Sequence, residues 1–75
     1  MYLTIGEKRV KAEFNPSKNE LVDQIKNKSA ELINLLEQMR DLPYKSSQEK
    51  QRLISIAQTE IESACMWGVK ANFTE

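Results

Sequence analysis

The sequence has no histidine and only one cysteine, Cys65, among its 75 residues. Histidine is the most common metal ligand and the most common general base, so both roles would have to fall to other side chains. A single thiol cannot form an internal disulfide, and it suits a reducing compartment such as the cytosol. These absences argue against a disulfide-linked scaffold and against a histidine-based metal or catalytic site.

The chain also lacks an excess of either charge and any long apolar run. Eleven Lys and Arg balance eleven Asp and Glu, whereas a protein that coats nucleic acid needs a basic excess to neutralise phosphates. Apolar runs are only a few residues long, far short of the roughly 20 residues that span a bilayer. The N-terminus has neither the charged start nor the apolar stretch of a signal peptide. We therefore expect no DNA partner and no membrane span.

The small size of the chain limits how it can be stabilised. Its 75 residues, 40% of them hydrophobic, indicate one small domain. A chain of this size buries only about 60% of its unfolded surface. Small proteins usually add disulfides, a metal or a partner chain. Because the first two find no support in the composition, oligomerisation is the option that remains.

Two long segments have apolar residues at the spacing typical of helices. Those of the first segment recur at multiples of three and four: Leu21, Ile25, Leu32, Leu36 and Met39. Ser17 and Glu20 match a capping box, and Pro16 disfavours helical geometry just ahead of it. We predict one helix over residues 17–41 and a connector over residues 42–46.

The second segment continues this helical spacing through Leu53, Ile54, Ala57, Ile61, Ala64, Cys65 and Met66. Ser46-Ser47-Gln48-Glu49 offers another capping box, so we predict a helix over residues 47–72. Gly68 lies inside this helix, where the missing side chain lets another backbone or a ligand come close. Two helices of similar length with a short connector should pack antiparallel as a hairpin.

The first 16 residues do not share this pattern. Val10, Ala12 and Phe14 alternate with charged residues, which is a strand-like period over a very short stretch. We predict an extended or irregular N-terminal arm over residues 1–16. The fold class is therefore all-α, a two-helix hairpin with an irregular arm. Because the apolar stripes are too wide for a single interface, we expect the hairpin to assemble into a homo-oligomer.

A polar minority beside the apolar stripes suggests a phosphate ligand. Lys26 and Ser29 lie three residues apart on one helical face, and Lys28 flanks them. A lysine with hydroxyls nearby could bind a phosphate, although spacing alone favours ordinary solvated lysines. Phe14 could stack on a base at the start of the first helix, although the residues alone favour a hydrophobic staple.

Two further side chains could pack or act chemically. Trp67 is more typical of a packing anchor between helices than of a ligand platform. Cys65 in its apolar stretch is more typical of a small buried residue than of a reactive thiol. The sequence shows no metal-ligand spacing, no phosphate-binding glycine loop and no nucleophile with a plausible base, so we expect no enzyme, no cofactor and no metal.

Several short segments, in this order and spacing, resemble one known family. They are Gly6-Glu7-Lys8-Arg9-Val10, Phe14-Asn15-Pro16-Ser17, Ile25-Lys26, Leu32-Ile33, Arg52-Leu53, Ala57-Gln58-Thr59 and Glu62-Ser63-Ala64-Cys65-Met66-Trp67-Gly68-Val69-Lys70-Ala71. Together they resemble the small helical-hairpin sponge proteins that phages use against CBASS immunity. The same hairpin domain recurs in some phage inhibitors of Thoeris immunity. The chain looks like the version carried by large myophages of the T-even type.

This resemblance implies a function that periodicity alone does not. Members of the family are hexamers that bind cyclic di- and trinucleotide messengers without cleaving them. The messengers then stay below the level that activates CBASS effectors in the cytoplasm of the host cell. The rival interpretations are a helical adaptor that binds a host or phage protein through its apolar faces, and an enzyme that hydrolyses the messenger.

The resemblance also implies two sets of binding residues. For cyclic dinucleotides these are Phe14, Asn15 and Lys26, where Phe14 stands in place of the tyrosine of some members. For cyclic trinucleotides they are Lys28, Ser29 and Lys70, where Lys70 stands in place of an arginine. A lysine gives up the bidentate phosphate contact that an arginine makes.

Overall fold

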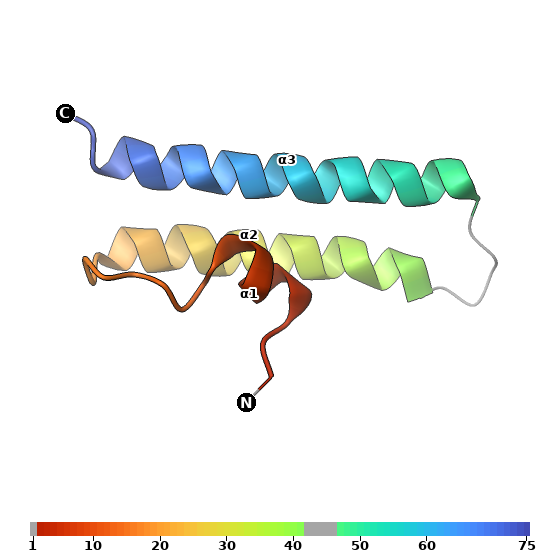
Figure 1. Ribbon diagram of the computed structural model, residues 1–75, viewed down its shortest axis with the longest axis horizontal. Helices are drawn as coiled ribbons and strands as arrows, with labels where there is room; N and C mark the ends of the chain where they lie inside the picture. The colour runs from red at the N-terminus through yellow and green to blue at the C-terminus, as the bar shows by residue number, and fades with distance from the viewer. Residues whose placement is uncertain (1, 42–46) are drawn as a thin grey trace.

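The computed structural model describes residues 2–41 and 47–75, in which helices are the only regular elements. They are α1 (Ile5–Val10), α2 (Glu20–Gln38), the 3-10 turn η1 (Met39–Asp41) and α3 (Gln48–Asn72). In Figure 1 α2 and α3 lie side by side and antiparallel. The predicted all-α hairpin is therefore confirmed, while the predicted connector, residues 42–46, lies outside the described residues.

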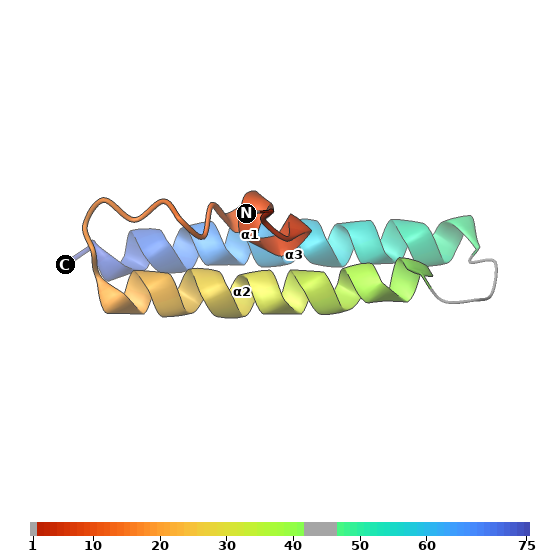
Figure 2. The same ribbon diagram turned by 90° about the horizontal axis from the view of Figure 1, so that it is seen from below.

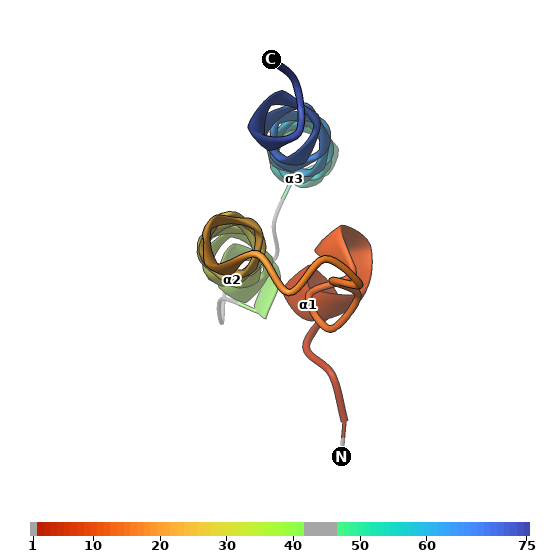
Figure 3. The ribbon, with the colours of Figure 1, turned by 90° about the vertical axis from the view of Figure 1, so that its left-hand side faces the viewer.

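The N-terminal arm, residues 2–16, contains a helix and is not irregular throughout. Figure 2 shows it along one side of the hairpin, and in Figure 3 α1, α2 and α3 form the corners of a triangle. Thr4 caps α1 with a full capping box: its hydroxyl accepts a bond from the Glu7 amide (3.1 Å), and the Glu7 carboxylate accepts one from the Thr4 amide (2.8 Å). These bonds from Thr4 lower the pKa of Glu7 below its ordinary value.

The alternation of apolar residues in this arm does not form a strand. Val10 is the last residue of α1, and Lys11 follows in left-handed geometry with a φ of 54°. The Ala12 amide donates back to the Glu7 carbonyl at 2.9 Å. The prediction of an extended arm was therefore wrong over residues 5–10, because a capped helical turn there satisfies the backbone locally.

The helix α2 begins three residues later than its sequence predicts. Lys18 has a φ of 59°, and Ser17 donates its hydroxyl to Asn15 (2.6 Å) instead of capping a helix. Asn19 is the cap, and its side-chain oxygen accepts bonds from the amides of Leu21 (2.9 Å) and Val22 (3.3 Å). The capping box of Ser17 and Glu20 is thus wrong, because the left-handed residue between them turns the chain away.

The helix α3 agrees closely with the range predicted for it. Ser47 is its cap and accepts a hydrogen bond from the Lys50 amide at 3.1 Å. The helix then runs to Asn72, and no helix in residues 2–41 or 47–75 has both the length and the apolar character that crossing a bilayer would need. Ser46, the first residue of the predicted capping box, lies outside the described residues.

The buried core is small and lies where the three helices meet. It consists of Val10, Ala30, Ile33 and Cys65, with Ala12, Ile25, Ile61 and Val69 packed against it. Cys65 is 4% exposed, so the prediction that it is a small buried residue is confirmed. Each helix contributes at least one of these side chains, which explains why α1 stays docked on the hairpin.

A glycine allows α1 to approach α2 very closely. A Cβ atom on Gly6 would lie 2.8 Å from the carbonyl carbon of Ala30, so a side chain there would meet backbone. The Gly6 amide donates to the side-chain oxygen of Asn34 at 2.8 Å, and the Asn34 amide group donates to the Thr4 hydroxyl at 3.0 Å. The contact therefore fixes both the distance and the position of α1 along α2.

A buried glutamine connects all three helices. Gln58 is 2% exposed, and its amide donates to the Ile33 carbonyl (3.2 Å) and to the Glu37 carboxylate (2.9 Å). Its oxygen accepts bonds from Arg9 (3.3 Å) and Arg40 (2.9 Å). Every hydrogen-bonding group of this side chain is thus satisfied. The bond from Gln58, assisted by Arg40, lowers the pKa of Glu37 below its ordinary value.

Many large apolar side chains remain exposed on the single chain. They include Leu21, Leu32, Leu35, Leu53, Ile56, Met66, Trp67 and Phe73, each of which is at least 39% exposed. They lie on α2, on α3 and just beyond the end of α3. One hairpin interface therefore leaves much of the apolar stripe of each helix uncovered.

Two glycine-to-alanine substitutions should affect stability differently. Gly6→Ala should lower the free energy of unfolding by about 1–3 kcal/mol, because the new methyl group meets the Ala30 backbone. Gly68→Ala should leave it unchanged or raise it by up to about 1 kcal/mol, since its methyl group would meet Ile25 at an ordinary 3.6 Å. Urea unfolding followed by circular dichroism at matched protein concentration measures both. Equal midpoints for the parent and Gly6→Ala would contradict the close contact.

Candidate functional site

Three of the residues predicted to bind a ligand line one cavity. Phe14 and Asn15 belong to the arm, and Lys26 belongs to α2. The cavity has a volume of about 190 Å³, and Val69 of α3 and Phe73 just beyond it also line it. Its remaining lining residues are Pro16, Ser17 and Val22. The structure thus brings Phe14, Asn15 and Lys26 together.

Lys26 is the most unusual of these residues because its charged side chain is only 8% exposed. Its ammonium donates hydrogen bonds to the carbonyl of Lys11, at 3.1 Å, and to the carbonyl of Phe14. It also lies 5.5 Å from the centre of the Phe14 ring. A buried charge is costly unless it is compensated, and the arm supplies part of that compensation. Since an ammonium has three donors, the two carbonyls leave one for a ligand.

Phe14 is exposed on the surface instead of packing on the first turn of α2. Its side chain is 64% exposed and borders both this cavity and a hollow of about 450 Å³ on the arm. A hydrophobic staple would involve the residue before the helix cap, which is Lys18 because Asn19 is the cap. The staple interpretation is therefore wrong, and the ring is free to contact a ligand.

Asn15 shapes the turn between the arm and α2. Its amide group donates to the Asn19 carbonyl (2.8 Å) and to the Asp23 carboxylate (3.0 Å), and its oxygen accepts the Ser17 hydroxyl bond. Both amide donors are therefore used inside the chain. Asn15 holds Phe14 beside Lys26, and only its oxygen has capacity left for a ligand.

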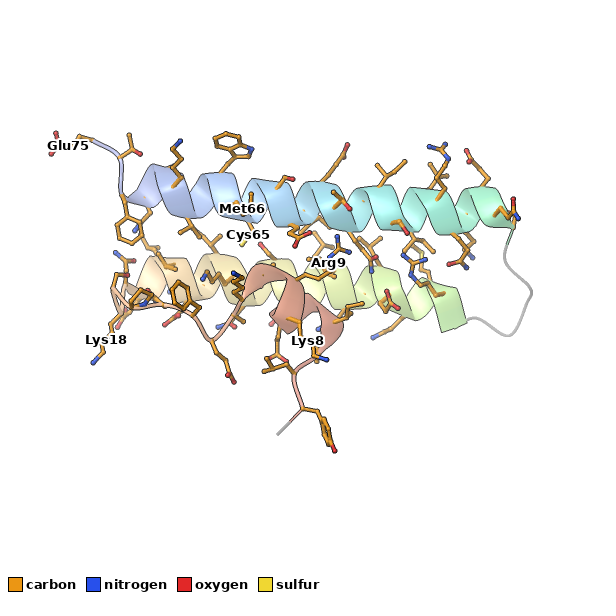
Figure 4. All side chains as sticks on the ribbon, in the orientation of Figure 1. Lys8, Arg9, Lys18, Cys65, Met66 and Glu75 are labelled. Carbon is orange, nitrogen blue, oxygen red and sulfur yellow. The ribbon has the colours of Figure 1, made fainter. Side chains whose placement is uncertain are left out.

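A second cavity, of about 320 Å³, also has Lys26 and Val69 in its wall. Arg9, Val10 and Lys11 line it from the arm, and Glu62, Cys65 and Met66 line it from α3. Figure 4 shows Arg9 extending from α1 towards α3, where it donates to Thr59 (3.1 Å) and to Glu62 (3.0 Å). Three cationic side chains face one carboxylate here, so the pair of cavities favours an anionic ligand.

Sequence reasoning did not identify Arg9 as part of the site. Its partners, Thr59 and Glu62, lie 50 and 53 residues further along the chain. No local spacing predicts such a contact, and Arg9 stands out in the sequence only as part of the segment Gly6-Glu7-Lys8-Arg9-Val10. The one local signal was the Thr4–Glu7 capping box, which would have placed Arg9 on a helix.

The residues predicted for a cyclic trinucleotide lie in two separate places on the chain. Lys28 and Ser29 line a hollow of about 310 Å³ that α2 and α3 form without the arm. Lys70 lines a hollow of about 410 Å³ near the end of α3, together with Trp67, Ala71, Thr74 and Glu75. The two hollows share no lining residue. One chain therefore does not bring Lys28 and Ser29 together with Lys70.

The described part of the chain holds no group of three or more Cys, Asp or Glu side chains placed to bind a metal ion. Two carboxylates around the pair of cavities are instead used in hydrogen bonds. Asp23 accepts a bond from Asn15, and Glu62 accepts one from Arg9. The arrangement is therefore suited to holding an anion with cations and backbone groups.

Comparison with known proteins identifies the family. A family model described as the Acb2/Tad1 hairpin domain matches residues 6–73, which is nearly the whole chain. Comparisons with curated proteins and with solved structures give no match. The match includes α1 from its second residue onward, all of α2 and α3, and the residues that line the cavity of Phe14, Asn15 and Lys26. It confirms the resemblance to the phage anti-CBASS proteins and to the hairpin domain that they share with anti-Thoeris proteins, and the chain therefore belongs to the Acb2/Tad1 hairpin domain family.

Proposed function

We propose that this phage anti-defence protein binds cyclic di- and trinucleotide immune messengers and sequesters them without cleavage. CBASS effectors in the cytoplasm of the infected cell would then stay inactive. The observation that carries the proposal is the convergence of Phe14, Asn15 and Lys26 on one cavity, in a chain that belongs to this family.

The side chains of the cavity suit the chemistry of a cyclic dinucleotide. The third ammonium donor of Lys26 can bind a phosphate oxygen, and Arg9 and Lys11 add positive charge nearby. The exposed ring of Phe14 can stack on a base. Neither a phenyl ring nor an amide group transfers protons at neutral pH, so Phe14 and Asn15 suit binding better than hydrolysis.

The cavity of one chain is too small to enclose such a ligand. Its volume of about 190 Å³ falls below the roughly 300–1,000 Å³ of typical ligand sites. Exposed apolar side chains such as Leu35 on α2 and Leu53 on α3 provide surface for another copy of the chain. We propose a homo-oligomer, and a hexamer as the resemblance implies, in which a neighbouring chain completes the site.

Recovery of the ligand tests sequestration directly. The protein should bind a cyclic dinucleotide and a cyclic trinucleotide in calorimetry, and heating the complexes should release both rings intact. A linear dinucleotide is the control and should bind more weakly, because it lacks the closed ring and loses more freedom on binding. Linear product that increases with protein concentration would reveal an enzyme. Failure of every ring to bind would favour the adaptor interpretation.

The assembled mass tests the oligomer. Light scattering at micromolar concentration should give about six times the chain mass of 8.7 kDa, because the exposed apolar stripes need partners. Dilution should lead to unfolding instead of to a stable folded monomer. A folded monomeric peak that persists at micromolar concentration would contradict the proposal.

Substitutions at Phe14 and Lys26 test the site. Lys26→Met keeps the apolar stem but removes the ammonium, so dinucleotide binding should weaken at least about tenfold. Phe14→Ala should weaken binding comparably with little loss of stability, since the ring is 64% exposed, while Phe14→Tyr should be tolerated. Calorimetry measures binding, and light scattering checks that each variant keeps the parent assembly.

Lys70→Met is the matched control, because it removes the same charge from an exposed lysine outside the cavity. It should leave dinucleotide binding unchanged. Lys26→Met also leaves two carbonyls of the arm without a donor, so its unfolding should be measured alongside its binding. A fully assembled Lys26→Met that binds the dinucleotide as tightly as the parent would rule out this site.

A further inference from the structure

We infer that Trp67 is a base-stacking platform that works together with Lys70 at the end of α3. The inference rests on the proposed function and adds a residue to its trinucleotide site. The ligand group that Trp67 would contact is the flat face of a nucleobase, while the adjacent ammonium of Lys70 would contact a phosphate.

The first observation is the exposure of Trp67. Its side chain is 66% exposed, although the sequence alone favours a packing anchor between helices. Within the hairpin, α3 packs on α2 through residues such as Ile54, Gln58 and Cys65, which are all less than 5% exposed. Trp67 therefore does not anchor the packing of the chain on itself. A large exposed aromatic surface is a feature of binding sites.

The second observation is the charge placed beside this ring. The Lys70 ammonium lies 5.4 Å from the centre of the Trp67 ring, within the range of a cation–π interaction. This interaction holds a positive charge over one face of the indole, so a base would stack on the opposite face. A phosphate bound by Lys70 would bring its attached nucleoside next to the indole, which is how an aromatic ring and a cation together bind a nucleotide.

The third observation is the hollow that these two residues share. Its volume of about 410 Å³ is within the range of small-molecule sites and about twice that of the Phe14 cavity. The remaining residues of its wall are Ala71, Thr74 and Glu75. The Thr74 hydroxyl donates to the Lys70 carbonyl at 2.8 Å, which holds the chain beyond α3 against the last turn.

The position of Trp67 on α3 connects the two separate parts of the predicted trinucleotide site. Ala64 lines the hollow of Lys28 and Ser29, and Trp67 lines the hollow of Lys70. Residues three apart in a helix are neighbours on one face. Trp67 thus lies one helical turn from the first hollow and inside the second. A base stacked on it would lie in the hollow of Lys70, one helical turn from the hollow of Lys28 and Ser29.

Fluorescence offers a direct test, because Trp67 is the only tryptophan in the sequence. In the ligand-free oligomer, acrylamide should quench its emission readily, as expected for an exposed indole. A cyclic trinucleotide should quench the emission of Trp67 by stacking, with saturation at the concentration that calorimetry gives. A cyclic dinucleotide should change it far less. Emission that acrylamide cannot reach would show that another copy of the chain covers Trp67, and would overturn the inference.

A matched pair of substitutions separates stacking from apolar bulk. Trp67→Phe keeps an aromatic face, while Trp67→Leu keeps apolar volume without one. Trp67→Leu should weaken trinucleotide binding about tenfold or more, which corresponds to about 1.4 kcal/mol. Trp67→Phe should weaken it less, and both variants should keep the parent mass and the parent affinity for the dinucleotide.

The outcomes distinguish this inference from the proposed function. If the parent binds the trinucleotide and Trp67→Leu binds it equally well, the stacking platform is refuted while sequestration stands. If Trp67→Leu loses its assembly together with both ligands, Trp67 is a packing anchor between chains and the inference is refuted. If the parent binds no cyclic oligonucleotide, the proposed function and the inference fail together.

Discussion

The arrangement of the site depends on one buried ammonium. Lys26 of α2 donates hydrogen bonds to the carbonyls of Lys11 and Phe14, which follow α1 in the arm. These bonds attach the arm to α2. Lys26 is only 8% exposed, so without these bonds its ammonium would lose its hydration with no hydrogen bonds to compensate. The same side chain lines two cavities and lies beside the Phe14 ring. Lys26 therefore both holds the arm on α2 and lines the candidate site.

Hydrogen bonds of buried polar groups help to fix how the three helices pack, because the apolar core is small. Gln58 has every hydrogen-bonding group satisfied, and its partners come from α1, α2 and η1. Such a group is costly when any one partner is missing, so it favours a single arrangement of the three helices. Apolar contacts have no preferred direction and allow helices to shift along one another, whereas these hydrogen bonds form only at one relative position of the helices. The small core of Val10, Ala30, Ile33 and Cys65 thus acquires a fixed register.

Periodicity predicted the two long helices because each repeats an apolar spacing over many turns. It placed the start of α2 wrongly, because the left-handed geometry of Lys18 depends on bonds that Asn15 and Asn19 make around it. It missed α1, which is too short to show a period and is held by contacts to α2, although Thr4 and Glu7 carried a readable cap. The residues alone marked Phe14 and Lys26 as possible ligand contacts but favoured a staple and a solvated lysine. The family resemblance grouped them with Asn15 in one site, because their proximity depends on tertiary packing.

The close contact of Gly6 with the Ala30 backbone has a consequence for how this protein can evolve. A larger residue at position 6 would push α1 away from α2, so this position offers little freedom for change. Phe14, Trp67 and Lys70 are exposed, and most substitutions at such positions alter stability only slightly. Lys26 and Asn15 belong both to the scaffold and to the candidate site. The exposed side chains that would meet a ligand are otherwise separate from the residues that fix the fold. A phage whose host adopts a new messenger could adjust its recognition one exposed side chain at a time and keep the same fold.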